Sequence, residues 1–135
     1  MLFETRELVE PIKLVTSQQQ LFKVQKYRKQ QYKYLFPNVK TFLYDPFDRH
    51  AYVFFTKHDG KLTSTGRLVL DSAAGLPEDG VFPSGIDCFR KQGKRLAEFG
   101  RFVISKGNKT SLIKAYYSSL YRIAVENKID IETFA

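Results

Sequence analysis

The chain has 135 residues, enough for one domain with a hydrophobic core and too few for two, so we expect a single domain over residues 1–135. Hydrophobic residues make up 43% and charged residues 27%, which favours a soluble globular protein. The one cysteine permits no internal disulfide, which fits the cytoplasm, and with only two histidines beside it a structural zinc site is not expected. The net charge of +8 favours an anionic partner, and nucleic acid, an anionic cofactor, an acidic carrier protein and anionic lipid all stay open.

The first 37 residues predict an opening segment followed by one helix. Residues 4–15 combine early acids with Pro11, a pattern not typical of a signal peptide, and favour a short strand or an arm. Ser17 is a suitable N-cap for a helix over residues 17–36, which Pro37 ends. One side of this helix is rich in Lys, Gln and Arg, and the other carries a stripe spaced by three and four residues: Leu21, Val24, Arg28, Tyr32 and Leu35.

A hairpin is predicted after the extended or looping segment 42–50. Residues 51–56 form one strand and residues 62–71 its partner, with Asp59-Gly60 as the turn between them. Both strands are apolar on both faces, so we expect layers on both sides of the sheet. The loop that follows is rich in Gly and Pro, and residues 84–95 have room for a short helix.

Residues 95–105 predict a strand that carries charge inside an apolar run. By strand alternation, Glu98 and Arg101 point to opposite faces of the sheet. An isolated glycine in a strand suggests a bulge, and a bulge at Gly100 would bring the two charged side chains nearer to one face.

The last elements predict a crossover. A turn over residues 105–111 leads into an amphipathic helix over residues 111–128, and residues 129–135 begin another strand. A strand, helix and strand of this length form a parallel crossover unit, which here follows an antiparallel meander. The element order therefore predicts an α/β fold with a mixed sheet. No apolar run is long enough to span a bilayer.

Polar residues along these elements form an ordered set: Arg28 and Tyr32, the D-x-x-D pair Asp45 and Asp48, Arg67 in "TGRLVL", Phe82 in a Pro-flanked loop, and the E-x-x-R pair Glu98 and Arg101. In order and spacing, over roughly residues 20–135, the set resembles the autoinducer (acyl-homoserine-lactone) synthases and their relatives the long-chain N-acyl amino acid synthases. Both are GNAT-like N-acyltransferases. The resemblance implies a GNAT-like mixed sheet flanked by helices.

The resemblance also implies an activity. An acyl group would leave a thioester on acyl carrier protein, or on coenzyme A, and form an amide with an amine such as an amino acid. The acyl-phosphopantetheine thioester is then a co-substrate, with no permanently bound cofactor and no metal. Autoinducer synthases carry a tryptophan soon after the first helix, and this chain has none, which favours an amino acid over S-adenosylmethionine.

Roles for single residues follow from the same resemblance. Glu98, Asp45 and Asp48 are expected to be catalytic, and the substrate-binding residues are Arg28, Tyr32, Arg67, Phe82 and Arg101. In GNAT-like folds the turn before the crossover helix receives the phosphopantetheine arm, and a helix N-terminus favours phosphate. Here that turn consists of Lys106, Gly107, Asn108, Lys109 and Thr110.

Plainer interpretations stay open for each of these features. Asp45 and Asp48 can cap neighbouring amides in a turn, Arg67 and Arg101 can belong to a structural ion-pair network, and the basic helix and the basic turn can be solvated surface. The alternative function is a non-catalytic GNAT-like module that binds an acidic protein or, less favoured, nucleic acid. A GNAT-like fold also needs a strand pair and a helix after the strand that begins at Ile129. We expect these elements to be missing from the 135 residues, to be supplied by a second chain or a homodimer, or to be absent because the protein is a degenerate relative.

Overall fold

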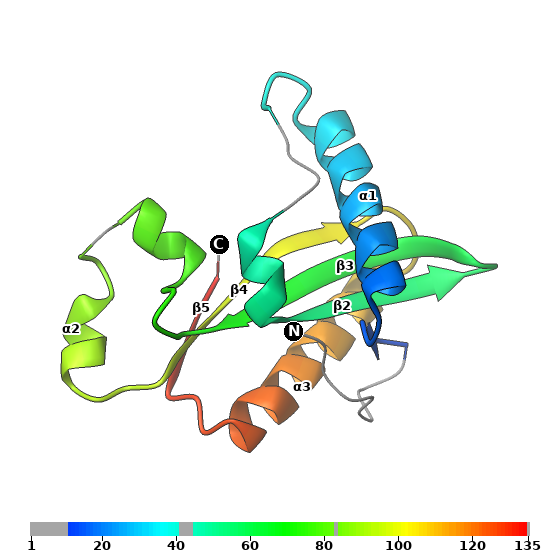
Figure 1. Ribbon diagram of the computed structural model, residues 1–135. Helices are drawn as coiled ribbons and strands as arrows, with labels where there is room; N and C mark the ends of the chain where they lie inside the picture. The colour runs from blue at the N-terminus through cyan, green and yellow to red at the C-terminus, as the bar shows by residue number, and fades with distance from the viewer. Residues whose placement is uncertain (1–10, 41–44, 83, 135) are drawn as a thin grey trace.

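The computed structural model describes residues 11–40, 45–82 and 84–134. Its centre is a five-stranded sheet in the order β1-β2-β3-β4-β5 (Figure 1). The first four strands are antiparallel neighbours, and β5 runs parallel to β4. The strands are β1 (Lys13–Leu14), β2 (Ala51–His58), β3 (Lys61–Leu70), β4 (Leu96–Ile104) and β5 (Ile131–Phe134). The predicted mixed sheet, with a meander followed by a crossover, is confirmed.

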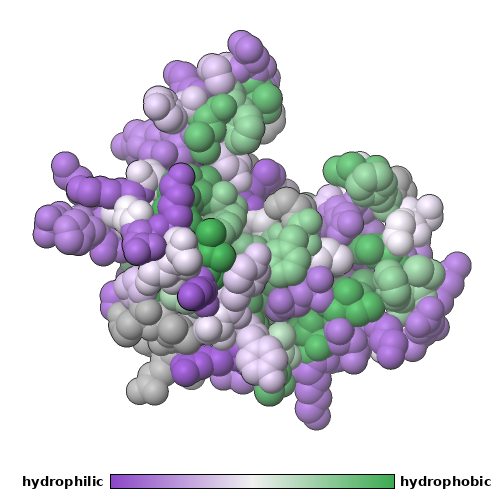
Figure 2. All heavy atoms as spheres, turned by 180° about the vertical axis from the view of Figure 1, so that it is seen from behind, coloured by the Kyte–Doolittle hydropathy of each residue, from purple (hydrophilic) through white to green (hydrophobic). Residues whose placement is uncertain are grey.

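Two long helices cover opposite faces of this sheet (Figure 1). Helix α1 (Gln18–Leu35) packs through Leu21 and Val24 on one face, and helix α3 (Lys109–Glu126) covers the other. The face seen from behind has hydrophobic atoms in its middle and also on its upper projection and right-hand lobe, with hydrophilic side chains around them (Figure 2). No helix in the described parts of the chain is both long and apolar enough to cross a membrane.

The predicted helix boundaries hold to within two residues. The Ser17 hydroxyl accepts a hydrogen bond from the Gln20 amide at 3.1 Å and caps α1 as expected. The prediction that Leu35 lies on the buried stripe is wrong, because that side chain is 51% exposed at the end of the helix, which projects beyond the sheet. The segment 1–10 of the predicted opening arm and residues 42–44 lie outside the described residues.

In the described parts of the chain, three short helices lie between the main elements: η1 (Pro46–His50), η2 (Pro77–Gly80) and α2 (Asp87–Lys91). The first begins inside the D-x-x-D pattern, with Asp45 as its N-cap and Asp48 within it, and the other two lie in the segment between β3 and β4. The expected short helix within residues 84–95 is thus confirmed as α2, while η2 falls in the predicted loop.

The predicted bulge lies where β3 and β4 pass Gly66. Thr65 pairs with Val103 and Arg67 pairs with Gly100, so two steps along β3 face three steps along β4. The extra residue belongs to β4, and Arg101 there takes the left-handed conformation with φ 53°. The bulge beside Gly100 is therefore confirmed, but the residue with positive φ is the arginine. It follows that Glu98 and Arg101 line the same side of β4.

Gly66 is required by close packing opposite this bulge. A Cβ atom at Gly66 would lie 2.8 Å from the Phe99 ring and 3.2 Å from the Tyr116 ring. Both rings belong to the hydrophobic core under α3, where Tyr116 also contacts Phe102 with ring centroids 4.7 Å apart. The glycine of the "TGRLVL" pattern thus lets the aromatic core approach the sheet at the point where β4 changes phase.

Candidate active site

A cleft of about 670 Å³, here named the Glu98 cleft, opens between the end of α1, the η2 segment and the middle of β4. It brings together five of the residues that sequence reasoning selected, which are Tyr32, Arg67, Phe82, Glu98 and Arg101. A second cavity of about 390 Å³ adjoins it, shares Tyr32 and Arg101 with it, and adds Arg28 and Asp45. Asp48 lies buried beneath both, so every residue of the ordered set gathers in this one region.

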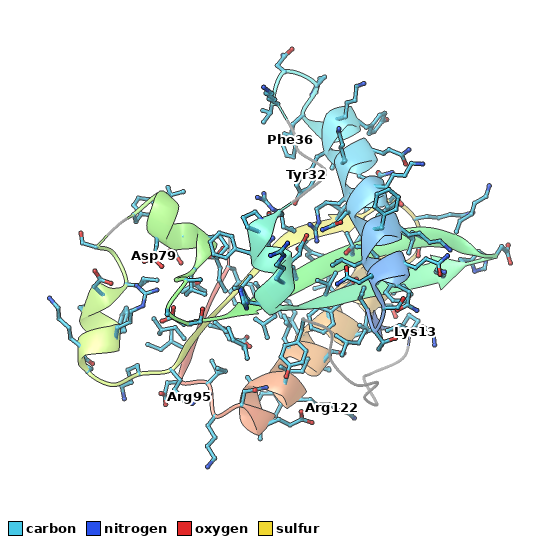
Figure 3. The ribbon with its side chains drawn as sticks, viewed as in Figure 1. Lys13, Tyr32, Phe36, Asp79, Arg95 and Arg122 are labelled. Atoms are coloured by element: carbon cyan, nitrogen blue, oxygen red, sulfur yellow. The ribbon has the colours of Figure 1, made fainter. Side chains whose placement is uncertain are left out.

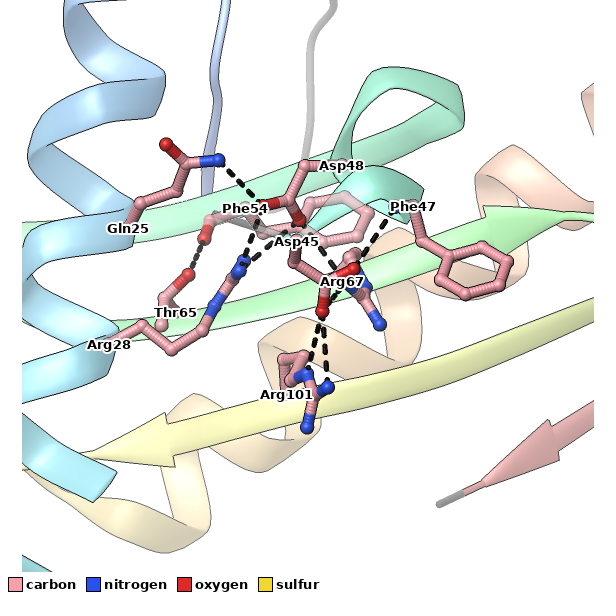
Figure 4. Close-up of polar contacts among 9 residues, drawn as sticks. All are labelled: Gln25, Arg28, Asp45, Phe47, Asp48, Phe54, Thr65, Arg67 and Arg101. Carbon is pink, nitrogen blue, oxygen red and sulfur yellow. Dashed lines mark hydrogen bonds and ion pairs between the residues drawn. The ribbon is translucent and has the colours of Figure 1, made fainter. Parts of the chain in front are cut away.

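Asp48 is the buried centre of an Arg–Asp network that consists of Arg28, Asp45, Asp48, Arg67 and Arg101 (Figure 4). It is 2% exposed and accepts hydrogen bonds from Arg28 at 3.0 Å, from Arg67 at 3.3 Å and from the Gln25 amide at 2.8 Å. A buried carboxylate needs such partners, because burial without them is very costly. Asp48 therefore ties α1 to β3 and does not face the cleft as a free base.

Asp45 links the same network to the bulge on β4. Its Oδ2 lies 2.8 Å from Arg67 and 3.1 Å from Arg101, while its Oδ1 accepts the Phe47 amide at 3.0 Å. Although burial opposes ionisation, the Arg67 and Arg101 guanidiniums keep the pKa of Asp45 below its usual value. Both plainer interpretations thus hold for Asp45, which caps η1 and also belongs to an ion-pair network.

Glu98 has no guanidinium or ammonium within ion-pairing distance among the described residues. The side chain is nearly buried, and its Oε1 accepts one hydrogen bond from the Glu78 backbone amide at 2.7 Å. Burial, together with the nearby Glu78 carboxylate, raises the pKa of Glu98 despite that hydrogen bond and the more distant Arg67 and Arg101. Among the three predicted catalytic carboxylates, Glu98 is the one suited to exchange a proton.

The rim of the Glu98 cleft is apolar. Five of its lining side chains are large, hydrophobic and more than half exposed: Phe36, Val39, Val81, Phe82 and Phe134. Tyr32 and Phe36 lie together at the end of α1, with ring centroids 6.1 Å apart, and η2 lies across the cleft from them (Figure 3). Exposed apolar side chains around one cleft mark a place where an apolar ligand would be covered.

The basic turn predicted for phosphate binding lies elsewhere. Lys106, Gly107 and Asn108 line a separate cavity of about 350 Å³ beside the β2–β3 hairpin, and Lys109 and Thr110 are exposed in the first turn of α3. The Asn108 side chain accepts the Ser111 amide at 3.1 Å and caps α3. The turn thus lies beyond the C-terminal end of β4, and none of its residues lines the Glu98 cleft.

Sequence reasoning missed two neighbours of the site. Gln25 lies three residues before Arg28 and four after Leu21 on the buried helical stripe, so its position alone marked it as an inward-facing amide. Glu78 lies in the Gly- and Pro-rich segment, where no periodicity exists, and its amide reaches Glu98 from twenty residues away. Only the folded chain could reveal the second contact.

Comparisons with known proteins agree with this architecture. The family model described as "N-acyl amino acid synthase FeeM" matches residues 18–133. The chain is similar to the solved structure of FeeM, an N-acyl amino acid synthase from uncultured soil microbes, with 18% identity and a TM-score of 0.80 over 96% of this chain and 71% of that one. No curated protein matches. This chain belongs to the FeeM family of GNAT-like N-acyltransferases, and it is an acyltransferase enzyme rather than a non-catalytic module.

Proposed function

We propose that this enzyme transfers an acyl group from a thioester on acyl carrier protein to the α-amine of an amino acid. The observation that carries the proposal is Glu98, a nearly buried carboxylate with a raised pKa, no ion-pair partner among the described residues, and a place in an apolar-rimmed cleft. An ammonium substrate must lose a proton before it can attack a thioester, and a carboxylate with raised pKa suits that step.

The reaction would proceed in three chemical steps: deprotonation of the amine, attack on the thioester, and collapse of the tetrahedral intermediate. Glu98 accepts a proton from the substrate ammonium, directly or through one water. The freed amine nitrogen attacks the thioester carbonyl carbon, forming the C–N bond and placing charge on the carbonyl oxygen. When the tetrahedral intermediate collapses, the C–S bond breaks, the amide nitrogen loses its second proton, and the leaving thiolate takes up a proton to become the free thiol.

The acceptor site is supported by the excess positive charge of the Arg–Asp network. Three guanidiniums face only two carboxylates, and Arg101, whose side chain is 44% exposed, reaches both cavities. A guanidinium makes rigid two-point contacts with a carboxylate. We infer that Arg101, with Arg67 behind it, orients the carboxylate of the amino acid while Glu98 receives its ammonium. Asp45 and Asp48 then serve by positioning the arginines.

The donor site is supported by β4 and by the charge of the chain. Within the described residues, β5 pairs only with Leu96–Phe99, so the edge of β4 from Gly100 onward has no strand beside it. We propose that the phosphopantetheine arm lies along this edge, between the Lys106–Thr110 turn and the cleft. The net charge of +8 suits an acidic carrier protein, and the apolar rim suits its acyl chain.

The experiment is a thioester assay. Acyl carrier protein and coenzyme A thioesters of increasing chain length are incubated with a panel of amino acids and their amides, and free thiol and N-acyl product are measured. We expect turnover with the carrier-protein thioester and with amino acids, and a higher KM for the amides, which lack the carboxylate. Equal turnover of amides, or turnover of coenzyme A thioesters alone, would contradict the assigned acceptor or donor.

A further inference from the structure

We propose that Arg90 is a positioning residue for acyl transfer, because it holds η2 at the place where the Glu78 amide can hydrogen-bond to Glu98. The inference rests on the proposed role of Glu98 as the proton acceptor. Arg90 lies on α2, outside the cleft and outside the set of site residues selected from the sequence.

Arg90 uses each of its five N–H groups in a contact that we name the Arg90 clamp, formed with Asp71, Asp79 and Asp87. It contacts Asp71 through Nε at 2.7 Å and Nη2 at 3.0 Å, and Asp79 through Nη2 at 2.7 Å and Nη1 at 2.8 Å. A fifth bond joins Nη1 to Asp87 at 2.8 Å. The hydrogen bonds that Arg90 donates to Asp79 and Asp71 raise the pKa of Arg90, so its guanidinium is charged at every working pH.

The three carboxylates come from separate elements. Asp71 follows β3, Asp79 lies in η2, and Asp87 is the first residue of α2. The Arg90 guanidinium therefore holds the end of β3, η2 and the start of α2 together. A two-point contact fixes the orientation of its partner as well as the distance, and Arg90 makes two of them, which a lysine cannot do.

Asp79 passes this constraint to the cleft. Its Oδ2, which Arg90 holds, also accepts the Leu76 amide at 2.7 Å, and the Asp79 amide donates to the Leu76 carbonyl at 3.0 Å. Pro77 and Glu78 lie between them, and the Glu78 amide donates to Glu98 Oε1 at 2.7 Å. The clamp thus reaches Glu98 through one short helical turn, with Leu76 anchored in the core at 1% exposure.

The charged groups that face Glu98 come from three elements. The Glu78 carboxylate from η2 disfavours ionisation, and Arg67 from β3 and Arg101 from β4 favour it. The Glu78 amide is the one hydrogen-bond donor to the Glu98 carboxylate that the described residues supply. If η2 moved, Glu98 would lose that donor together with the weaker opposing effect of the Glu78 carboxylate, while the burial remained. Its ionised form would then be harder to reach, and the acid limb of the rate profile would move to higher pH.

The test compares Arg90→Lys and Arg90→Gln with Lys91→Gln, which removes a charge from the neighbouring exposed position on the same helix. The pH profile of kcat/KM is measured for thioester aminolysis. The Glu98 carboxyl is titrated separately by NMR with ¹³C-labelled glutamate, assigned through Glu98→Gln. We expect both Arg90 variants to lose activity roughly tenfold on the acid limb and far less at the alkaline plateau, with a matching upward move of the Glu98 titration. Lys91→Gln should match the wild type.

Each other result contradicts the proposal in its own way. Folded Arg90 variants with a wild-type rate profile and a wild-type Glu98 titration would overturn it. Lys91→Gln acting as strongly as Arg90→Gln would show a general charge effect and overturn it too. A moved Glu98 titration without a moved rate profile would remove Glu98 as the proton acceptor, and with it the part of Arg90 in the reaction. Absence of turnover in the wild type would instead contradict the proposed function and not the contact between Arg90 and Glu98. If Arg90→Gln fails to fold by circular dichroism, Asp79→Asn carries the same comparison.

Discussion

The Arg–Asp network and the Glu98 cleft lie side by side on the α1 face of the sheet, but their carboxylates have opposite environments. Asp45 and Asp48 are held by guanidiniums at 2.8–3.3 Å, and against the effect of burial the guanidiniums keep the pKa of Asp45 below its usual value. Glu98 is just as buried but has only one backbone donor, which leaves its charged form disfavoured. The same functional group, a carboxylate, is thus a fixed support in one region and, in the mechanism we propose, a proton acceptor in the other.

The largest effect that would break this comparison is loss of the proton acceptor. We expect Glu98→Gln to lower kcat by about 10²–10⁴-fold, the usual range for a general base, without lowering stability, because the amide removes the penalty of burying a charge. The matched control is Glu132→Gln on β5, where burial also raises the pKa of a glutamate that does not line the cleft. Equal losses from both substitutions would refute the special role of Glu98.

The second effect is on stability and belongs to the network. Asp48→Asn leaves Arg28 buried without its charged partner and leaves Arg67 with Asp45 alone, so the free energy of unfolding should fall by about 3 kcal/mol or more. Asp59→Asn, at the exposed tip of the β2–β3 hairpin, should change it by less than about 0.5 kcal/mol. Urea unfolding measures both. A small loss at Asp48 would mean that the network contributes little to the fold.

A third, smaller effect comes from the packing that underlies both regions. Gly66→Ala places a Cβ against the rings of Phe99 and Tyr116, so we expect a loss of about 1–3 kcal/mol in thermal or urea unfolding. Gly80→Ala is the control, since no atom lies within 4 Å of a Cβ at that position. If Gly66→Ala lowers the free energy of unfolding no more than the control does, the rings of Phe99 and Tyr116 can move aside at little cost.

The smallest effect concerns acid stability, and its sign differs between the two regions. The lowered pKa of Asp45 contributes stability that is present above its unfolded value, about 3.9, and is lost as the pH falls through the folded value. Asp45→Asn should therefore lose less stability on acidification than the wild type. The raised pKa of Glu98 contributes stability below about 4.3 that is lost as pH rises, so Glu98→Gln should gain on the wild type towards neutral pH. Unfolding free energies between pH 3 and 7 that keep the wild-type slope in both variants would contradict the assignment.

The sequence predicted those parts of the site that follow regular elements. Helical spacing placed Arg28 and Tyr32 on the inward side of α1, and strand alternation with one glycine predicted the bulge that turns Arg101 towards Glu98. The same spacing failed for Leu35, because periodicity does not reveal where the sheet under a helix ends.

The contacts of the β3–β4 connection could not be predicted. Glu78 and Arg90 lie in a segment rich in glycine, proline and acids, where no period relates one residue to the next. Their partners are fixed by the path of the loop across the sheet edge, and many loop paths satisfy the same composition. The roles of Asp45 and Asp48 were left open for a related reason, since only the distances to three arginines distinguish a support from a base.

The bulge at Arg101 has a consequence for how this enzyme can be improved. Its φ of 53° lies where a side chain costs of order 1 kcal/mol and glycine costs nothing. A chain optimised for stability alone would carry glycine there, yet glycine would remove the guanidinium that reaches both cavities. Position 101 is thus a point of stability–activity trade-off, and a thermostabilised variant that replaces this arginine should be suspected of a weakened acceptor site.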